Sequence, residues 1–242
     1  MPVDPTFRDA VRRKYDQIDQ IWQRTDRWHT HSHKQILACA FELTRLRPGG
    51  YDTVIDIGAG GYPYEIAHNH YIQIDIAFER IRNSATAICA DAHTLPIRNA
   101  IADCVVCVGP VINYCSLIEV IAEVSRISKP NAHFLFHVEL SNSLEFLFTK
   151  HFRADTSFVR TFYQGEEPLW IYSDHNVRQT LMNAGFTIRR RRYLHIASGL
   201  AYRLVSNSNI AAGIAPFDTF LRYFPGVGGI SDSAIFICEK TT

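Results

Sequence analysis

Short apolar runs recur along the first two thirds of the chain, each too short for a helix of ordinary length. Five of them occupy residues 53–57, 71–76, 87–92, 103–109 and 133–140. Runs that are apolar throughout, rather than alternating with polar residues, indicate strands buried on both faces, as in parallel sheets. This pattern predicts an α/β fold built on a mostly parallel sheet.

Amphipathic segments precede and separate these strands. Residues 116–128 repeat apolar positions at helical spacing, and Pro130 is placed to end that helix. Residues 6–46 also repeat at this spacing, with a polar, histidine-rich break at residues 25–34 that divides them into two helices. The alternation of strands and helices favours a doubly wound sheet.

The second half of the chain is less regular. Helices are expected at residues 142–152 and 173–186, and strands at residues 187–196 and 231–240. With the five earlier runs, these two strands bring the predicted sheet to seven. A long apolar insertion occupies residues 197–229.

Composition limits this picture further. The chain has 242 residues, 47% of them hydrophobic, and a formal net charge of +1. We expect one domain over residues 1–242, with a helical cap (1–50), a core (51–140) and a C-terminal region (141–242). No apolar run approaches the roughly 20 residues of a membrane span, and the first residues lack the apolar core of a secretory signal. A cytoplasmic protein with no membrane association is therefore expected.

A cysteine pair and a run of arginines would be compatible with zinc and with nucleic acid, but neither ligand is expected. Cys104 and Cys107 have the CxxC spacing of zinc sites, but they lie in a strand-like run and no second pair exists. Buried thiols and no metal are predicted.

Arg189–Arg192 would alternate between the two faces of a strand, which dilutes any basic patch. With a net charge near zero, nucleic-acid binding is not expected.

A glycine-rich turn follows the first predicted strand. Gly58 and Gly60 stand at its carboxyl end, and Asp75 closes the next strand. Backbone amides in such a turn can approach a ligand closely, and an acid at the neighbouring strand end can accept both hydroxyls of a ribose. Proteins that bind NAD, FAD or S-adenosylmethionine share this arrangement, and a tight turn without a ligand is the alternative. Tyr62 and Pro63 stand where a dinucleotide loop would have its third glycine and its helix.

A second acid, Asp91, ends the third strand in the segment CADAHTLPI. Together with VIDIGAGGY, YIQIDI, IADCVVCVGPVINY and SRISKPNAHFLF, this segment resembles the class I S-adenosylmethionine-dependent methyltransferases of the small-molecule type, similar to methyltransferase type 11. The resemblance covers residues 53–139 and keeps the five segments in the order and spacing of the family. It implies a Rossmann-like, doubly wound fold and S-adenosylmethionine as cofactor. A dinucleotide would leave Asp91 without a role.

The resemblance also implies a role for each matching residue. Asp56, Gly58 and Gly60 would line the methionine part of the cofactor. Asp75 would bind the ribose hydroxyls, and Asp91 would accept the adenine amino group.

Four neighbours complete the cofactor contacts that this resemblance implies. The Ala92 amide would meet a ring nitrogen of the adenine, and Gly109 would lie beneath the ligand at the end of the fourth strand. Ala59 and Ile76, next to the glycine turn and the ribose acid, are also expected to contact the cofactor.

The N-terminal helical segment is the expected lid, because an aromatic-bearing helix before the first strand folds over the cofactor in the resembling family. Tyr15 is the candidate for contact with the sulfonium or carboxylate, and Trp22 for an aromatic wall. Ordinary helix packing is the alternative for both. Tyr114, just past the fourth strand, is assigned to the same site and would border the acceptor.

Methyl transfer requires alignment of the two reactants, and a base if the accepting atom carries a proton. His31 and His33 in the polar break are candidate bases, with solvated capping residues as the alternative. His137 and Glu139, two positions apart on the fifth strand, face the same side and are candidates for acceptor binding or proton transfer.

The expected activity is in-line methyl transfer from S-adenosylmethionine to an oxygen or nitrogen of a small molecule or natural-product intermediate. The aromatic-rich insertion at residues 197–229 would shape the acceptor pocket. A peptide or protein acceptor entering through a wider groove is one alternative, and a non-catalytic interaction module is another. The sequence predicts no oligomeric state.

Overall fold

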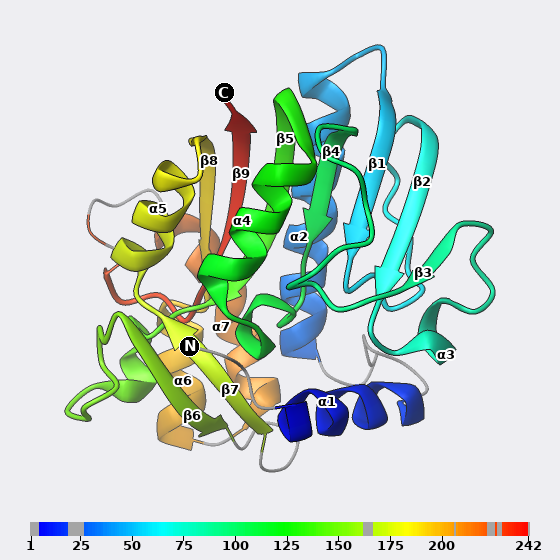
Figure 1. Cartoon of the computed structure of the whole chain (residues 1–242). Helices are drawn as coiled ribbons and strands as arrows, with labels where there is room; N and C mark the ends of the chain where they lie inside the picture. The colour runs from blue at the N-terminus through cyan, green and yellow to red at the C-terminus, as the bar shows by residue number, and fades with distance from the viewer. Residues whose placement is uncertain are drawn as a thin grey trace.

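A seven-stranded sheet forms the centre of the molecule (Figure 1). The computed structural model describes residues 5–18, 27–161, 167–205, 207–221, 226 and 229–241. The strands, in spatial order, are β3 (Ala87–Cys89), β2 (His68–Asp75), β1 (Tyr51–Ile57), β4 (Ala102–Cys107), β5 (Ser128–Glu139), β9 (Ser233–Lys240) and β8 (Phe186–Leu194).

Six of these seven strands run in the same direction. The pairs β1–β2, β1–β4, β2–β3 and β4–β5 are parallel, whereas β9 is antiparallel to both of its neighbours, β5 and β8. The prediction of a Rossmann-like, mostly parallel, seven-stranded sheet is confirmed. The carboxyl ends of the parallel strands lie together at the lower edge in Figure 1.

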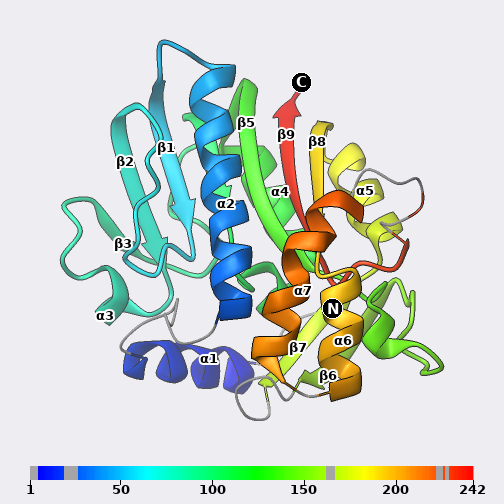
Figure 2. The same ribbon diagram turned by 180° about the vertical axis from the view of Figure 1, so that it is seen from behind.

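Helices cover both faces of this sheet. α4 (Leu117–Ile127) and α5 (Asp174–Asn183) lie in front of it in Figure 1, and α2 (Arg27–Leu46) and α7 (Ser208–Leu221) lie in front of it in Figure 2. α1 (Pro5–Gln17) crosses the carboxyl edge. No helix within the described ranges is both long and apolar enough to span a membrane. The shorter elements are α3 (Phe78–Ile81), α6 (Ala197–Val205), η1 (Ile112–Tyr114), η2 (Leu144–Phe146), β6 (Thr156–Thr161) and β7 (Glu167–Tyr172).

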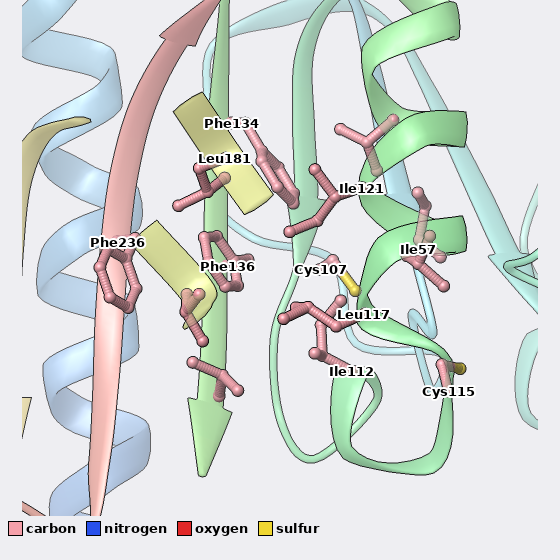
Figure 3. Packing of buried hydrophobic residues seen from close by; sticks show 14 of the residues in the cluster. Ile57, Cys107, Ile112, Cys115, Leu117, Ile121, Phe134, Phe136, Leu181 and Phe236 are labelled. Carbon is pink, nitrogen blue, oxygen red and sulfur yellow. The ribbon is translucent and has the colours of Figure 1, made fainter. Parts of the chain in front are cut away.

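One cluster of buried hydrophobic residues joins α4 to β4, β5 and β9 (Figure 3). Every residue of β4 is buried, as expected for a central strand with helices on both faces. The rings of Phe134 and Phe136 stack with their centroids 4.9 Å apart, and those of Phe136 and Phe236 with their centroids 5.0 Å apart. This packing fixes the strands whose ends carry the site.

The histidine-rich segment at residues 25–34 is helical wherever the structure describes it. His31 and His33 lie in the first two turns of α2. The buried side of this helix already begins at Ser32 and continues through Ile36, four residues later. The predicted break is therefore wrong from the first residue of α2 onward, because burial of one helix face outweighs the polarity of the other positions.

Residues 142–152 do not form the predicted helix. They contain only the 3-10 turn η2, and Phe148 has a φ of 65°. Arg153, just beyond, has a φ of 58°. An α-helix of L-residues cannot include such left-handed positions, so this prediction is wrong.

The C-terminal half otherwise contains more regular structure than its sequence suggests. The helix predicted at residues 173–186 is confirmed as α5, and the Ser173 hydroxyl caps it by accepting from the Asn176 amide at 3.0 Å. The apolar insertion, for which no secondary structure was predicted, contains two helices, α6 and α7. The β6–β7 hairpin was not predicted.

The four consecutive arginines lie on the edge strand β8. Arg190 and Arg192 both donate to Glu42 of α2, at 3.1 and 2.6 Å. Arg189 donates to Glu239 of β9 at 2.7 Å. Three of the four arginines therefore pair with two carboxylates on neighbouring elements, which fits a charged sheet edge better than a surface for nucleic acid.

Gly61→Ala is expected to destabilise the fold. Gly61 has a φ of +76°, and a Cβ at this position would lie 2.1 Å from the carbonyl oxygen of Arg80. Strained backbone of this kind costs about 1–3 kcal/mol, and the clash adds to it, so urea titration is expected to show a loss of about 2 kcal/mol or more in the free energy of unfolding. Gly213→Ala is the control, because a Cβ in that helix meets nothing within 4 Å. It is expected to raise stability by up to about 1 kcal/mol; equal effects of the two changes would contradict the steric argument.

Candidate active site

A cavity opens at the carboxyl ends of β1, β2 and β4. Its roof is formed by Arg8, Val11 and Tyr15 of α1, the helix that crosses this edge in Figure 1. Parallel α/β sheets bind ligands at this edge. The cavity brings together residues that are far apart in the sequence. Nine of those expected to contact a cofactor line it, namely Tyr15, Gly58, Ala59, Asp75, Ile76, Asp91, Ala92, Gly109 and Tyr114.

The glycine turn forms the floor beside β1. Gly58 and Gly60 have φ values of +67° and +57°. A Cβ on Gly58 would lie 2.3 Å from a methyl group of Val111, so only glycine fits there. The amides of Gly58 and Ala59 both donate to the Ile74 carbonyl, at 2.8 and 3.1 Å, which ties the turn to β2.

Asp75 ends β2 and is clamped by two backbone amides. Its Oδ2 accepts from the Gly60 amide and its Oδ1 from the Ala77 amide, both at 2.8 Å. Burial raises the pKa of this carboxyl, and the two amide hydrogen bonds oppose that shift. The clamp orients the carboxylate on the cavity wall, where its remaining lone pairs can accept further hydrogen bonds.

Asp91 follows β3 and is surrounded by donors. His93 donates to its Oδ1 from the backbone amide, at 2.9 Å, and from Nδ1, at 2.5 Å. The ring proton is on Nδ1 because Nε2 accepts from the Ser116 amide at 2.9 Å. Arg8 of α1 pairs with Oδ2. Burial opposes ionisation, but these hydrogen bonds outweigh it and hold the pKa of Asp91 well below its usual range.

The sequence did not single out Arg8 or His93. His93 could have been noticed, since it stands two positions after the acid in the same segment. Arg8 could not, because 83 residues separate it from Asp91.

α1 closes the cavity through aromatic contacts as well as through Arg8. The hydroxyls of Tyr15 and Tyr114 lie 3.2 Å apart, and their rings meet edge to face at 5.9 Å. The ring of Phe7 packs against those of Tyr114 and of Phe158 in the hairpin, with centroids 6.4 and 5.7 Å apart. Trp22, expected to form an aromatic wall, lies outside the described residues.

Two residues expected at the methionine end are not part of the cavity lining. Gly60 instead donates its amide to Asp75, as described above. Asp56 is 1% exposed and accepts a hydrogen bond from the Tyr71 hydroxyl at 2.9 Å, while its second oxygen has no hydrogen-bond partner. Burial raises the pKa of Asp56 to about 8; the hydrogen bond from Tyr71 opposes the shift and the nearby charge of Asp75 adds to it.

The candidate bases lie on the α2 side of the same sheet edge. The ring of His33 meets that of Tyr62, a cavity-lining residue, at 5.3 Å, and burial lowers the pKa of His33. His137 is buried, and its Nδ1 lies 3.2 Å from the carbonyl oxygen of Gly109, which also lines the cavity. His33 and His137 therefore adjoin the cavity wall from two different elements.

His31 and Glu139 lie farther along this edge. The ring of His31 faces that of His195 with centroids 6.5 Å apart. The backbone of Glu139 exchanges two hydrogen bonds with the Asn113 side chain, each 3.0 Å. Within the described ranges, no group of three or more His, Cys, Asp and Glu side chains is arranged to hold a metal ion.

The segment that supplies most of the cavity lining matches a known protein family. Residues 55–136 match the family model described as a methyltransferase domain. The match includes the glycine turn, Asp75, Asp91 and the end of β4. No curated protein sequence matches the chain.

Several solved structures share the fold. The N-methyltransferase NodS of Bradyrhizobium japonicum, in complex with S-adenosyl-L-homocysteine, is 12% identical over 99% of this chain and 100% of its own, with a TM-score of 0.57. A complex with the Haloferax volcanii Trm112 methyltransferase activator contains a chain that is 16% identical over 100% of this chain and 98% of its own (TM-score 0.58). An S-adenosylmethionine-dependent methyltransferase from Mesorhizobium loti is 14% identical over 84% and 99% (TM-score 0.53). At these identities the likeness shows a common fold.

Asp56→Asn is expected to change the pH dependence of stability. The folded-state pKa of Asp56 is raised from 3.8 to about 8. The stability that the protonated carboxyl contributes is therefore fully present below pH 4 and is lost as the pH rises toward 8. The free energy of unfolding of the wild-type protein should therefore fall, relative to the variant, by up to about 1.4 kcal/mol per pH unit in this window.

Urea titrations of both proteins between pH 4 and 8 measure this difference. Asparagine keeps the oxygen that Tyr71 contacts, so the hydrogen bond at 2.9 Å can persist in the variant. A constant difference between the two proteins across this range would show that Asp56 ionises normally.

Proposed function

We propose that the chain, which carries a class I S-adenosylmethionine-dependent methyltransferase domain, transfers the methyl group of that cofactor to an oxygen or nitrogen of a small molecule. One observation carries the proposal. The glycine turn, two strand-end carboxylates and an open position over β4 line one cavity beneath a single helix. These are the features that a nucleoside with an amino-acid tail requires.

The residues present fit this cofactor. Asp75, with both oxygens oriented by backbone amides, would accept the two ribose hydroxyls. Asp91 would accept the adenine amino group, and the Ala92 amide would meet the ring. Gly109 has a φ of +81° and nothing within 4 Å of the position of a Cβ, so the space above the end of β4 is open.

The methionine end would lie against the glycine turn and Tyr15. An aromatic face near a sulfonium is favourable for the same reason as a cation–π pair. Gly58 has no side chain, so the cofactor could approach the backbone of the turn closely. Asp56 would act from behind the turn through Tyr71 rather than by direct contact.

A small acceptor fits the roof of the cavity better than a polypeptide does. α1 is held down by Arg8 on Asp91 and by Tyr15 on Tyr114. Apolar side chains, such as Val11 and Val111, make up most of the remaining lining. Such a covered, apolar space suits a small molecule, whereas a peptide needs an open groove.

When bound, S-adenosylmethionine supplies an electrophilic methyl group. The protein then has to align the acceptor with that group, exclude water and, for a hydroxyl or amine, remove a proton. His33 and His137, which adjoin the cavity wall, are candidates for contact with the acceptor.

We also place the protein in a reducing cytoplasm, because all six of its cysteines are free thiols.

Calorimetric titration with S-adenosylmethionine tests the cofactor assignment. We expect binding by the wild-type protein and more than tenfold weaker binding by Asp75→Ala, a loss of about 1.4 kcal/mol or more, because the ribose hydroxyls lose their acceptor. Asp52→Ala is the control, since this exposed carboxylate lies near the opposite end of β1. No binding of the cofactor at millimolar concentration would favour a non-catalytic interaction module. Unchanged affinity in a folded Asp75→Ala variant would remove the ribose assignment alone.

Mass spectrometry tests the acceptor class. The protein with S-adenosylmethionine is incubated with a panel of phenols, amines and carboxylic acids and, separately, with a library of unstructured peptides. We expect a gain of one CH₂ group in a member of the small-molecule panel. Methylation confined to the peptides would replace the small-molecule proposal with a peptide methyltransferase.

A further inference from the structure

Hydrogen-bond donors surround Asp91 on the wall of the cavity. The backbone amide of His93 donates to its Oδ1 at 2.9 Å, and the ring Nδ1 of His93 lies 2.5 Å from the same oxygen. Arg8 donates to Oδ2. All three residues line the cavity. A carboxylate offers about four acceptor sites on its two oxygens, so these donors leave about one site, on Oδ2, for a ligand.

The tautomer of His93 follows from its contact with the residue before α4. The backbone amide of Ser116 lies 2.9 Å from His93 Nε2. An amide can only donate, so Nε2 keeps its lone pair and the ring proton is on Nδ1. The ring is therefore neutral and directs its N–H at Asp91. This N–H, the backbone amide and Arg8 are all donors, and each favours the ionised, accepting form of the carboxylate.

The segment after Asp91 is held to α4 by contacts that do not involve His93. The Leu95 amide donates to Glu123 of that helix at 2.8 Å, and the Leu95 carbonyl accepts from Arg126 at 3.1 Å. A histidine that served only to tie this segment to α4 would duplicate these contacts. The ring proton is different, because it is given to the carboxylate that faces the cavity.

We propose that His93 positions Asp91 for recognition of the purine base. Its ring and backbone N–H groups fill Oδ1, so that Oδ2 remains as an acceptor that selects an amino group over a carbonyl. The inference rests on the proposed function, in which Asp91 accepts the adenine amino group and the Ala92 amide meets a ring nitrogen. In hypoxanthine a carbonyl replaces the amino group, and that ring nitrogen carries a hydrogen. Two acceptors would then face each other at Asp91, and two donors at Ala92.

Two nucleosides that differ only in the base measure this selectivity. They are S-adenosyl-L-homocysteine and S-inosyl-L-homocysteine, each titrated calorimetrically into the wild-type protein. A site that hydrogen-bonds an N–H group discriminates strongly against an analogue without it, because polar groups of the site are left unpaired. We expect the inosyl compound to bind at least about 100-fold more weakly. Equal affinities would overturn the proposal.

Two substitutions at His93 each keep one of its two ring contacts. The amide nitrogen of asparagine takes the place of Nδ1, so His93→Asn can keep the donor to Asp91 and loses the acceptor for the Ser116 amide. The amide oxygen of glutamine takes the place of Nε2, so His93→Gln can keep the contact with Ser116 and loses the donor to Asp91. We expect the selectivity to fall at least about tenfold in His93→Gln, because a hydrogen bond to a charged group is lost, and less than about threefold in His93→Asn.

A purely structural role for His93 would give a different result. The two nucleosides share the ribose and the homocysteine, so a displaced segment would weaken the binding of both and leave the ratio of their affinities unchanged. An unchanged ratio in a folded His93→Gln protein would therefore overturn the proposal. Thermal unfolding followed by circular dichroism shows whether each variant is folded.

Nitrogen-15 NMR of the ligand-free wild-type protein tests the geometry without any substitution. We expect a neutral His93 ring at neutral pH, with its proton on Nδ1. A proton on Nε2 would overturn the proposal, since the ring would then have no donor for Asp91. Binding of neither nucleoside, together with the expected tautomer, would instead remove the proposed function, because the tautomer is measured without a ligand.

Discussion

The two hydrogen bonds to Asp75 join the turns that follow the first two strands. Its carboxylate accepts the Gly60 amide from the turn after β1 and the Ala77 amide from the turn after β2. Both turns are thereby held to one side chain, and the amides of the glycine turn are held to the Ile74 carbonyl just before it. The cavity floor depends on this junction, and partial burial of the carboxylate strengthens its hydrogen bonds.

α1 closes the cavity through the second acid. Arg8 pairs with Asp91 on the side of the carboxylate that His93 leaves open. In the proposed function, an adenine amino group would approach the same carboxylate, so the guanidinium and the adenine would compete for it or share it. The pKa of Asp91 is held well below its usual range, which keeps both oxygens available as acceptors at neutral pH. Closure of α1 and occupation of the adenine end are therefore linked.

The sheet could be predicted because it follows from local patterns, and the resemblance to a family then pointed to residues of which nine line one cavity. Parallel strands such as β1 and β4 are buried on both faces and appear as continuous apolar runs, and topology then brings Asp75 and Asp91 to one edge. The pairing of Arg8 with Asp91 could not be predicted, because it depends on how a distant helix lies on the sheet. Local polarity was also misleading for α2, where tertiary burial of one face extended the helix through the histidine-rich segment.

The carboxyl edge is divided at β4 into two chemically different halves. On the β1–β2–β3 side, acids oriented by backbone amides and by His93 form hydrogen-bond acceptors. On the β5–β9–β8 side, His195 is buried between two serine hydroxyls. Each ring nitrogen of His195 lies beside a hydroxyl, which can donate or accept, whereas Nε2 of His93 accepts from a backbone amide, which can only donate. The histidine beside the cofactor acids is therefore fixed in one tautomer and orients Asp91, because its partners leave it no other arrangement.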